Sequence, residues 1–93
     1  MNMIFEWDEN KNRINLRKHG VSFEEAESVF YDEFSLLLND LAHSETEDRF
    51  NVLGLSVNAN LLMVCHCYRE GDTIRIISAR KSTKTEAENY WRY

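Results

Sequence analysis

Four short segments rich in Val, Ile, Leu and aromatic residues restrict the fold of this chain more than any other feature. They span residues 34–38, 49–57, 61–68 and 73–79. Turn-forming clusters of hairpin length, residues 58–60 and 69–72, separate the last three segments. Strands joined by hairpins pair antiparallel, so the pattern predicts an antiparallel meander. Gly54 lies where the apolar phase shifts along the second segment, which predicts a β-bulge at this glycine.

The first third of the chain carries start and stop signals for two helices. Asp8 stands at the N-cap position before residues 9–19, and Gly20 follows at the position where a left-handed residue ends a helix. Ser22 and Glu25 have the spacing of a capping box, in which each side chain accepts a hydrogen bond from the other residue's backbone N–H. These signals predict a helix on each side of Gly20.

The remaining elements complete an α+β pattern. Residues 3–7 read as a short opening strand, and a second capping box, Thr83 with Glu86, predicts a closing helix toward residue 91. The order strand, two helices, four strands, helix predicts a mostly antiparallel sheet of four to five strands with the two N-terminal helices and the C-terminal helix packed on it. We expect the helices to gather on one face and leave the other face open to a ligand. Residues 1–93 are expected to form a single domain.

Composition and hydropathy place the chain among folded proteins of the cytoplasm. The chain is 43% hydrophobic, which is enough to build a core. Its longest apolar run is far shorter than the ~20 residues that cross a bilayer, and the N-terminus lacks the pattern of a secretory signal. We therefore expect a cytoplasmic protein with no membrane partner.

The charge distribution points in two directions. A net charge of −5 argues against a polyanionic partner. However, residues 31–50 carry a net −5, whereas residues 73–93 carry a net +3. A local basic surface can thus exist on an acidic protein, although an acidic surface also suits a basic partner protein.

Two cysteines flank a histidine within the third apolar segment. A strand places Cys65 and Cys67 on one face about 6–7 Å apart, which disfavours a disulfide. A closed zinc site needs four ligands, and no second Cys/His pair stands at ligand spacing, so we expect neither a metal nor a cofactor. The cysteines are expected to be small core residues, and His66 to be a hydrogen-bonded core histidine unless the other sheet face is open.

Several clusters of residues, spread over nearly the whole chain, form a recognisable pattern. It consists of residues 5–8, Lys11, Asn15, residues 18–26, Glu47 with Arg49, Gly54, residues 75–80, and Thr83, Glu86 and Tyr90. In this order and spacing the clusters resemble the BrnT family of toxins, which belongs to the wider RelE-like ribonucleases. The chain departs from the family pattern at Glu33, where the family has proline after the aspartate.

The resemblance has implications for fold, activity and partners. It implies a compact RelE-like fold and an endoribonuclease that cleaves RNA without a metal as the toxin of a type II toxin–antitoxin system. It further implies neutralisation by a BrnA-type ribbon-helix-helix antitoxin in a 2:2 complex that represses its own operon. Operator DNA would then be bound only through the antitoxin.

Metal-free cleavage of RNA requires three kinds of chemical help. The ribose 2′-hydroxyl attacks the phosphorus, so the protein must take its proton, stabilise a phosphorane and protonate the leaving 5′ oxygen. Arginine suits the phosphorane because its planar fork matches two phosphate oxygens, and histidine suits proton transfer because its pKa lies near neutral pH. The predicted catalytic residues are Arg80, Arg49, Glu47, His19, Lys18 and His66. The predicted RNA-binding residues are Arg75, Lys81, Lys84, Lys11 and Tyr90.

These candidates also have structural interpretations. The basic residues within 75–80 could keep an exposed strand soluble. Lys18 and His19 could complement the dipole at a helix C-terminus, and Glu47 with Arg49 could form a surface ion pair. The alternative function is a non-catalytic binding module that holds a basic DNA-binding partner and tunes its affinity for the operator.

Overall fold

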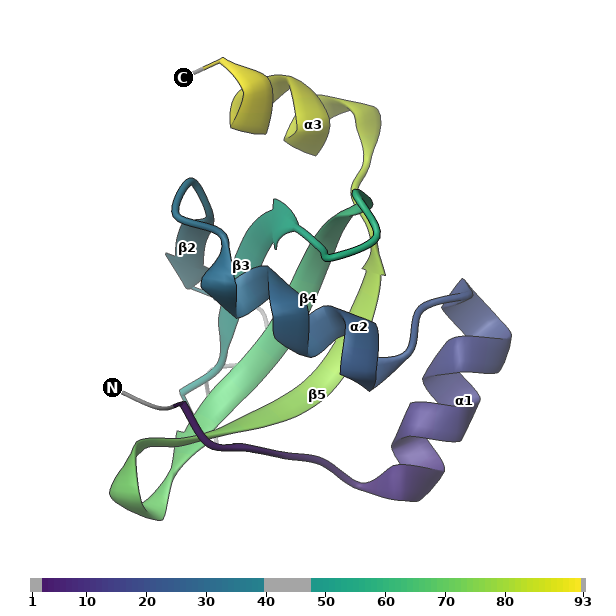
Figure 1. The fold of residues 1–93 in the computed structure, drawn as a ribbon, viewed down its shortest axis with the longest axis vertical. Coiled ribbons are helices and arrows are strands. Elements are labelled where there is room, and N and C mark those ends of the chain that lie inside the picture. Colours follow the sequence, from purple (N-terminus) through teal and green to yellow (C-terminus); the bar gives the residue numbers. More distant parts are fainter. Residues whose placement is uncertain (1–2, 40–47, 93) are drawn as a thin grey trace.

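The computed structural model describes residues 3–39 and 48–92, which form a five-stranded mixed sheet with three α-helices (Figure 1). The strands are β1 (Phe5–Glu6), β2 (Leu36–Asn39), β3 (Phe50–Leu55), β4 (Leu61–Arg69) and β5 (Thr73–Lys81). The helices are α1 (Glu9–His19), α2 (Phe23–Ser28) and α3 (Lys84–Trp91), with 3-10 turns η1 (Val29–Tyr31) and η3 (Glu70–Asp72). The strand order is β1-β5-β4-β3-β2; β2 to β5 form the antiparallel meander, and β1 pairs parallel to β5. The α+β prediction is confirmed.

The ends of α1 are those that the sequence predicts. The Asp8 carboxylate accepts hydrogen bonds from the backbone N–H groups of Asn10 and Lys11. Gly20 ends the helix with a left-handed φ of 71°, and its N–H donates to the carbonyl of Leu16. Local capping chemistry is sufficient to set both boundaries.

The sheet has two differently covered faces. On the first face, Val52 of β3, Val64 of β4 and Ala79 of β5 form a core with α2 and η1 residues such as Phe23 and Val29. On the second face, the alternate strand positions carry a smaller cluster of Leu53, Met63 and Tyr90, the last from α3.

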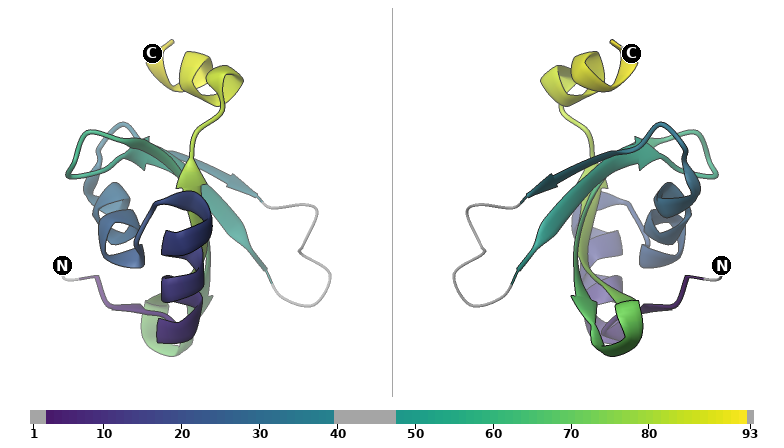
Figure 2. Two further views of the ribbon diagram at one scale, coloured as in Figure 1. Left: turned by 90° about the vertical axis from the view of Figure 1, so that its right-hand side faces the viewer. Right: turned by 90° about the vertical axis from the view of Figure 1, so that its left-hand side faces the viewer.

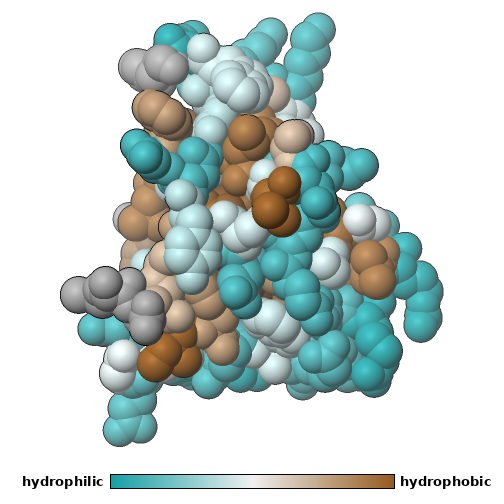
Figure 3. All heavy atoms as spheres, in the orientation of Figure 1, coloured by the Kyte–Doolittle hydropathy of each residue, from teal (hydrophilic) through white to brown (hydrophobic). Residues whose placement is uncertain are grey.

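The expectation that the helices gather on one face is therefore wrong for α3, which stands apart from α1 and α2 (Figures 1 and 2). The linker after β5 carries α3 to the second face, and the register of the strands decides which side chains it meets there. Apolar atoms also reach the surface along the side of the molecule that carries β2 (Figure 3). Leu37 and Leu38 on β2 are exposed.

A bulge interrupts the pairing of β4 with β5. Cys65 pairs with Ser78 and His66 pairs with Ile76, so Ile77 is an extra residue without a partner in β4. The predicted bulge at Gly54 is wrong, because Gly54 pairs regularly with Leu62. Gly54 instead permits close packing, since an added Cβ would lie 2.7 Å from Val29 Cγ1.

An asparagine of α1 hydrogen-bonds to the backbone of β5 in the part of this strand that β1 is too short to pair with. The Asn15 Nδ2 donates to the carbonyl of Ala79 at 2.8 Å, and Ala79 N–H donates to Asn15 Oδ1 at 3.1 Å. The same Nδ2 donates to the carbonyl of Val21 at 2.8 Å. Asn15 thus satisfies backbone groups that a neighbouring strand would otherwise satisfy, and it fixes α1 beside β5.

The two capping boxes have different outcomes. Thr83 and Glu86 form the complete box at the start of α3. At α2, Ser22 accepts the predicted hydrogen bond from the Glu25 N–H, but the Glu25 carboxylate does not reach back. That carboxylate instead accepts hydrogen bonds from Ser56 Oγ at 2.6 Å and from an amide of the same turn, Asn60 Nδ2, at 2.8 Å. Contacts with the β3–β4 hairpin replace the local one.

Within the described residues, none of the helices combines the length and the apolar character that a membrane span requires.

Candidate functional site

A pocket of about 420 Å³ opens on the second face of the sheet, beside α3. We call it the Arg80 pocket. Cross-strand partners in two rows line it: Asn51, Cys65 and Ser78 in one row, and Met63 with Arg80 in the next. Arg49, directly before β3, His19 at the end of α1, and Ala79 complete its lining. Separate parts of the chain therefore meet around one concavity.

The bulge at Ile77 brings the side chain of Arg80 to this face. In a regular strand, residues five positions apart point to opposite faces. The extra residue restores them to one face, so that Arg75 pairs with Cys67 and Arg80 pairs with Met63, both on the second face. Ala79, next to Arg80, meanwhile belongs to the core of the first face.

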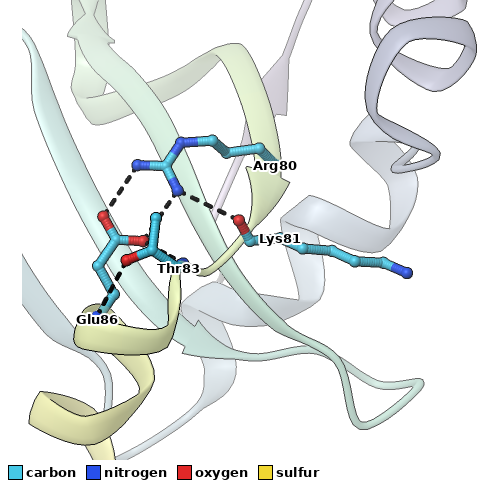
Figure 4. A network of polar contacts seen from close by, with 4 residues as sticks. All are labelled: Arg80, Lys81, Thr83 and Glu86. Atoms are coloured by element: carbon cyan, nitrogen blue, oxygen red, sulfur yellow. Dashed lines mark hydrogen bonds and ion pairs between the residues drawn. The ribbon is translucent and has the colours of Figure 1, made fainter.

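Arg80 is held in place by an acidic residue of α3 (Figure 4). Its two terminal nitrogens donate to the two carboxylate oxygens of Glu86, each at 2.9 Å, and Nη1 also donates to the carbonyl of Lys81 at 3.2 Å. The hydrogen bonds from Arg80 are the main cause that lowers the pKa of Glu86 below its usual value. Because Glu86 also accepts from the Thr83 N–H, the orientation of Arg80 is tied to the first turn of α3.

Glu86 does not use all of the guanidinium. Arginine has five N–H donors, and the contacts among the described residues use three of those of Arg80. The Nε–H and the second Nη2–H lie along the adjacent edge of the group, which matches two phosphate oxygens. The side chain of Arg80 is 41% exposed, so solvent reaches part of it.

The lining of the Arg80 pocket is electrostatically unlike the rest of the chain. Two arginines and a histidine contribute to it, whereas none of its described lining residues is Asp or Glu. The whole chain has 16 acidic and 11 basic residues. A low density of carboxylates around converging cations is the arrangement that binds an anion such as phosphate.

The family profile described as the ribonuclease toxin BrnT of type II toxin–antitoxin systems matches residues 7–86. The chain belongs to the BrnT family. It also superposes on the crystal structure of the Brucella abortus ribonuclease toxin BrnT with a TM-score of 0.69 and 22% sequence identity. The superposition covers 89% of this chain and 100% of the other, which shows a shared fold. No curated protein sequence matches the chain.

Three of the residues predicted for catalysis in this BrnT-family chain line the Arg80 pocket: Arg80, Arg49 and His19. Lys18 lies next to His19 and, with Lys11, lines an adjoining pocket between α1 and β5. Glu47 lies outside the described residues.

His66 is buried on the first face, and it does not line the Arg80 pocket. Its ring packs against Phe30 at a centroid distance of 4.8 Å and against Tyr68 at 5.5 Å. Burial lowers the pKa of His66 below its usual value, against the opposing effect of a hydrogen-bonding contact between Nδ1 and the carbonyl of Val64. The core interpretation of this histidine is the one that the structure favours.

Tyr90 and Arg75 are engaged in contacts away from the Arg80 pocket. The Tyr90 hydroxyl donates to Asp32 Oδ2 at 2.5 Å, and burial together with Asp32 raises the pKa of Tyr90 to about 12. This hydrogen bond joins α3 to the turn before β2. Arg75 pairs with Glu6 of β1 at 2.9 Å.

Two further predicted RNA-binding residues lie near the start of α3 and are exposed. The side chain of Lys81 points away from the guanidinium of Arg80 (Figure 4). Lys84 is the first residue of α3. Neither residue is part of the lining of the Arg80 pocket.

Sequence reasoning missed the polar floor of the Arg80 pocket. Asn51 and Ser78 were not among the predicted site residues, and Cys65 was expected to be a core residue, although it is half-buried and lines the pocket. Strand alternation places Cys65 opposite to His66, but it does not show which face is open. The pairing register of the strands would have been needed to assign these three side chains to the open face.

No group of three or more His, Cys, Asp or Glu residues within residues 3–39 and 48–92 is arranged to hold a metal ion.

Proposed function

We propose that this BrnT-family toxin is a metal-independent endoribonuclease whose active site is the Arg80 pocket. One observation carries the proposal: Arg80, Arg49 and His19 come from separate segments and line one pocket that has no carboxylate among its described lining residues. The chain has a net charge of −5, so its general solubility does not require such a grouping of cations.

In this proposal the two arginines act on the scissile phosphate. The 2′ oxygen attacks phosphorus, the bond from phosphorus to the 5′ oxygen breaks, and the products are a 2′,3′-cyclic phosphate and a 5′-hydroxyl. Arg80 binds the phosphate through the guanidinium edge that Glu86 leaves open, and Arg49 adds positive charge as the phosphorane forms. A guanidinium group is a permanent cation that can pair with two phosphate oxygens at once.

His19 is the proposed proton-transfer residue. It lines the Arg80 pocket at the C-terminal end of α1, and the hydrogen bonds of Asn15 to Ala79 fix this helix next to Arg80. An imidazole exchanges protons near neutral pH, so it can take the proton of the 2′-hydroxyl or supply one to the 5′ oxygen. His66, Tyr90 and Arg75 are left out of the proposed site because they do not line this pocket.

The type of antitoxin, the stoichiometry of the complex and its binding to the operator are also proposals. We expect a BrnA-type antitoxin with a ribbon-helix-helix domain, a complex of two toxins with two antitoxins, and repression of the operon through operator DNA bound by the antitoxin. Membership of a type II toxin–antitoxin family supports a protein antitoxin. Light scattering of the chain copurified with the product of its neighbouring gene tests the stoichiometry, and an operator shift with each protein alone tests which one binds DNA.

RNA cleavage by the purified, antitoxin-free protein in EDTA tests the enzymatic proposal. We expect cleavage by the wild type, a loss of about 10²–10³-fold in Arg80→Ala and Arg49→Ala, and no cleavage at a site that carries a 2′-deoxyribose. Arg13→Ala is the matched control, since Arg13 is exposed on α1 and removes the same charge. A requirement for magnesium would refute the metal-free mechanism. Intact RNA, together with a shifted operator affinity of the partner, would support the binding-module alternative.

A further inference from the structure

A second pocket of about 200 Å³ adjoins the Arg80 pocket at the edge of the sheet. We call it the Lys11 pocket. Its lining residues come from α1 and β5: Lys11, Ile14, Asn15, Lys18, His19, Ile77 and Ser78. Because His19 and Ser78 line both pockets, the two form one continuous surface around the outer edge of β5.

The Lys11 pocket continues the charge pattern of the Arg80 pocket. Lys11 and Lys18 are seven residues apart on α1, so they lie on one face of the helix about 10.5 Å apart along its axis. No Asp or Glu occurs among the described residues that line either pocket. Asp8 attracts Lys11, but the carboxylate of Asp8 already accepts two backbone hydrogen bonds as the N-cap of α1.

Two isoleucines supply an apolar surface between these lysines. Ile14 is 50% exposed, and the buried residues of α1 are Asn12 and Asn15, so the packing of the helix does not require an isoleucine at this position. Ile77 is the bulge residue, which has no partner in β4 and lies at the edge of the sheet. Apolar contact flanked by cations suits a nucleotide, which has an apolar base face and a charged backbone.

We propose that the Lys11 pocket is a subsite for the nucleotide next to the scissile phosphate in single-stranded RNA. Lys11 and Lys18 bind flanking backbone phosphates, and Ile14 and Ile77 contact the unpaired base or its ribose. The substrate strand thus crosses the edge of β5, from the Arg80 pocket to α1. This inference rests on the proposed ribonuclease function, and it gives Lys18 a binding role rather than the catalytic role that the sequence predicted.

Paired substrates of different length test the subsite. One substrate is a dinucleotide with the cleavable step, and the other is a single-stranded oligomer of about ten nucleotides with the same step. For the double variant Lys11→Ala/Lys18→Ala we expect kcat/KM on the oligomer to fall at least tenfold, while the rate on the dinucleotide stays within twofold. The salt dependence of oligomer binding should also weaken by about 1.4 in the slope of log K against log salt, since two phosphate contacts are lost.

The control is Arg13→Ala/Arg17→Ala, which removes two exposed positive charges from the same helix outside both pockets. This variant should stay within twofold of the wild type on both substrates. Equal losses of the lysine variant on the dinucleotide and the oligomer would overturn the subsite, because the lysines would then act at the scissile phosphate. An unchanged rate on both would overturn it as well.

The experiment distinguishes a failure of the ribonuclease proposal from a failure of the subsite. If the wild type cleaves neither substrate, the ribonuclease proposal is contradicted, and binding of the fluorescently labelled oligomer then decides the subsite by itself. In that case a loss of affinity in the lysine variant, absent from the arginine control, supports the subsite. Equal affinity of the wild type and the lysine variant refutes it.

Discussion

Glu86 holds the guanidinium of Arg80 with two parallel hydrogen bonds of 2.9 Å, and it does so from the helix that follows the strand of Arg80. The carboxylate therefore orients the arginine, whose hydrogen bonds to Glu86 and Lys81 use neither its Nε–H nor its second Nη2–H. Holding Arg80 in one orientation favours the binding of a phosphate, whereas neutralising its positive charge disfavours it. Removing the negative charge of Glu86 therefore shows which of these two effects dominates.

The substitution Glu86→Gln separates these effects. Glutamine keeps an oxygen for the Thr83 N–H but can no longer accept from both arginine nitrogens. We expect kcat for RNA cleavage to fall about threefold to tenfold because Arg80 loses its fixed orientation. The free energy of unfolding should change by less than about 1 kcal/mol, since the pair is partly exposed. Glu88→Gln, an exposed site on the same helix, is the control. A faster enzyme would mean that Glu86 competes with phosphate.

Removing the Asn15 side chain should destabilise the protein. Asn15→Ala leaves the Ala79 N–H without its partner and deprives the carbonyls of Ala79 and Val21 of their donor, all in a buried setting. We expect a loss of about 2–4 kcal/mol in the free energy of unfolding, measured with urea. The exposed Asn10→Ala on the same helix should change it by less than about 0.5 kcal/mol. Equal effects of the two substitutions would contradict the role of Asn15.

Gly54→Ala should cost stability through one identified contact. The added Cβ would lie 2.7 Å from Val29 Cγ1 and 3.1 Å from Ser35 Cβ, so the core must shift. We expect a loss of about 1–3 kcal/mol. In a double-mutant cycle with Val29→Ala, the combined loss should be smaller than the sum, because the valine substitution removes the closest clashing atom. Additive losses would show that the contact with Val29 is not the cause.

His66 should make the folded state sensitive to mild acid. Burial lowers its pKa in the folded protein, so the unfolded chain takes up a proton at a higher pH than the folded chain does. The contribution of neutral His66 is complete above about pH 6.5 and is lost as the pH falls below that value, by up to about 1.4 kcal/mol per pH unit. Urea unfolding at pH 7.5 and 5.5 measures the decline.

The matched variant for this prediction is His66→Leu, which should lose the decline between pH 7.5 and 5.5. His19→Gln should retain it, since His19 lies outside the core. This window lies above the range in which carboxylates titrate, so acid groups contribute little to it. A wild type that is equally stable at both pH values would disprove the assignment.

Local signals were sufficient to predict the elements but not the contacts between them. The caps at Asp8, Gly20 and Thr83 set helix ends within a few residues, because capping is a local interaction. The Glu25 carboxylate accepts a hydrogen bond from Ser56 Oγ instead of completing the local capping box. No local pattern contains that contact, since 31 residues separate the two side chains.

The candidate site was predictable as a set of cations, and the choice among them required the register. Arg80 and Arg75 look alike in the sequence, yet Arg80 lines the pocket whereas Arg75 pairs with Glu6 on the short parallel strand. The bulge that sets the direction of the Arg80 side chain cannot be recognised in the sequence, because Ile77 continues an apolar run. A glycine within a strand often indicates a bulge, but Gly54 is needed for a different reason, the close approach of Val29.

The extra residue in β5 also constrains how this chain can vary in length. Regular pairing of all five residues from Ile76 to Arg80 would exchange the two faces beyond Ile76, so Arg80 would point into the core while Ala79 faced the solvent. Deleting Ile77 would instead remove the bulge and leave Ala79 and Arg80 on their present faces, because Ile76 and Ser78 already oppose consecutive residues of β4. A residue gained or lost in the turn at 70–72 leaves the spacing from Ile76 to Arg80 intact. Homologous chains should therefore tolerate insertions and deletions in that hairpin, and should be one residue shorter between these two positions only where the bulge is lost as well.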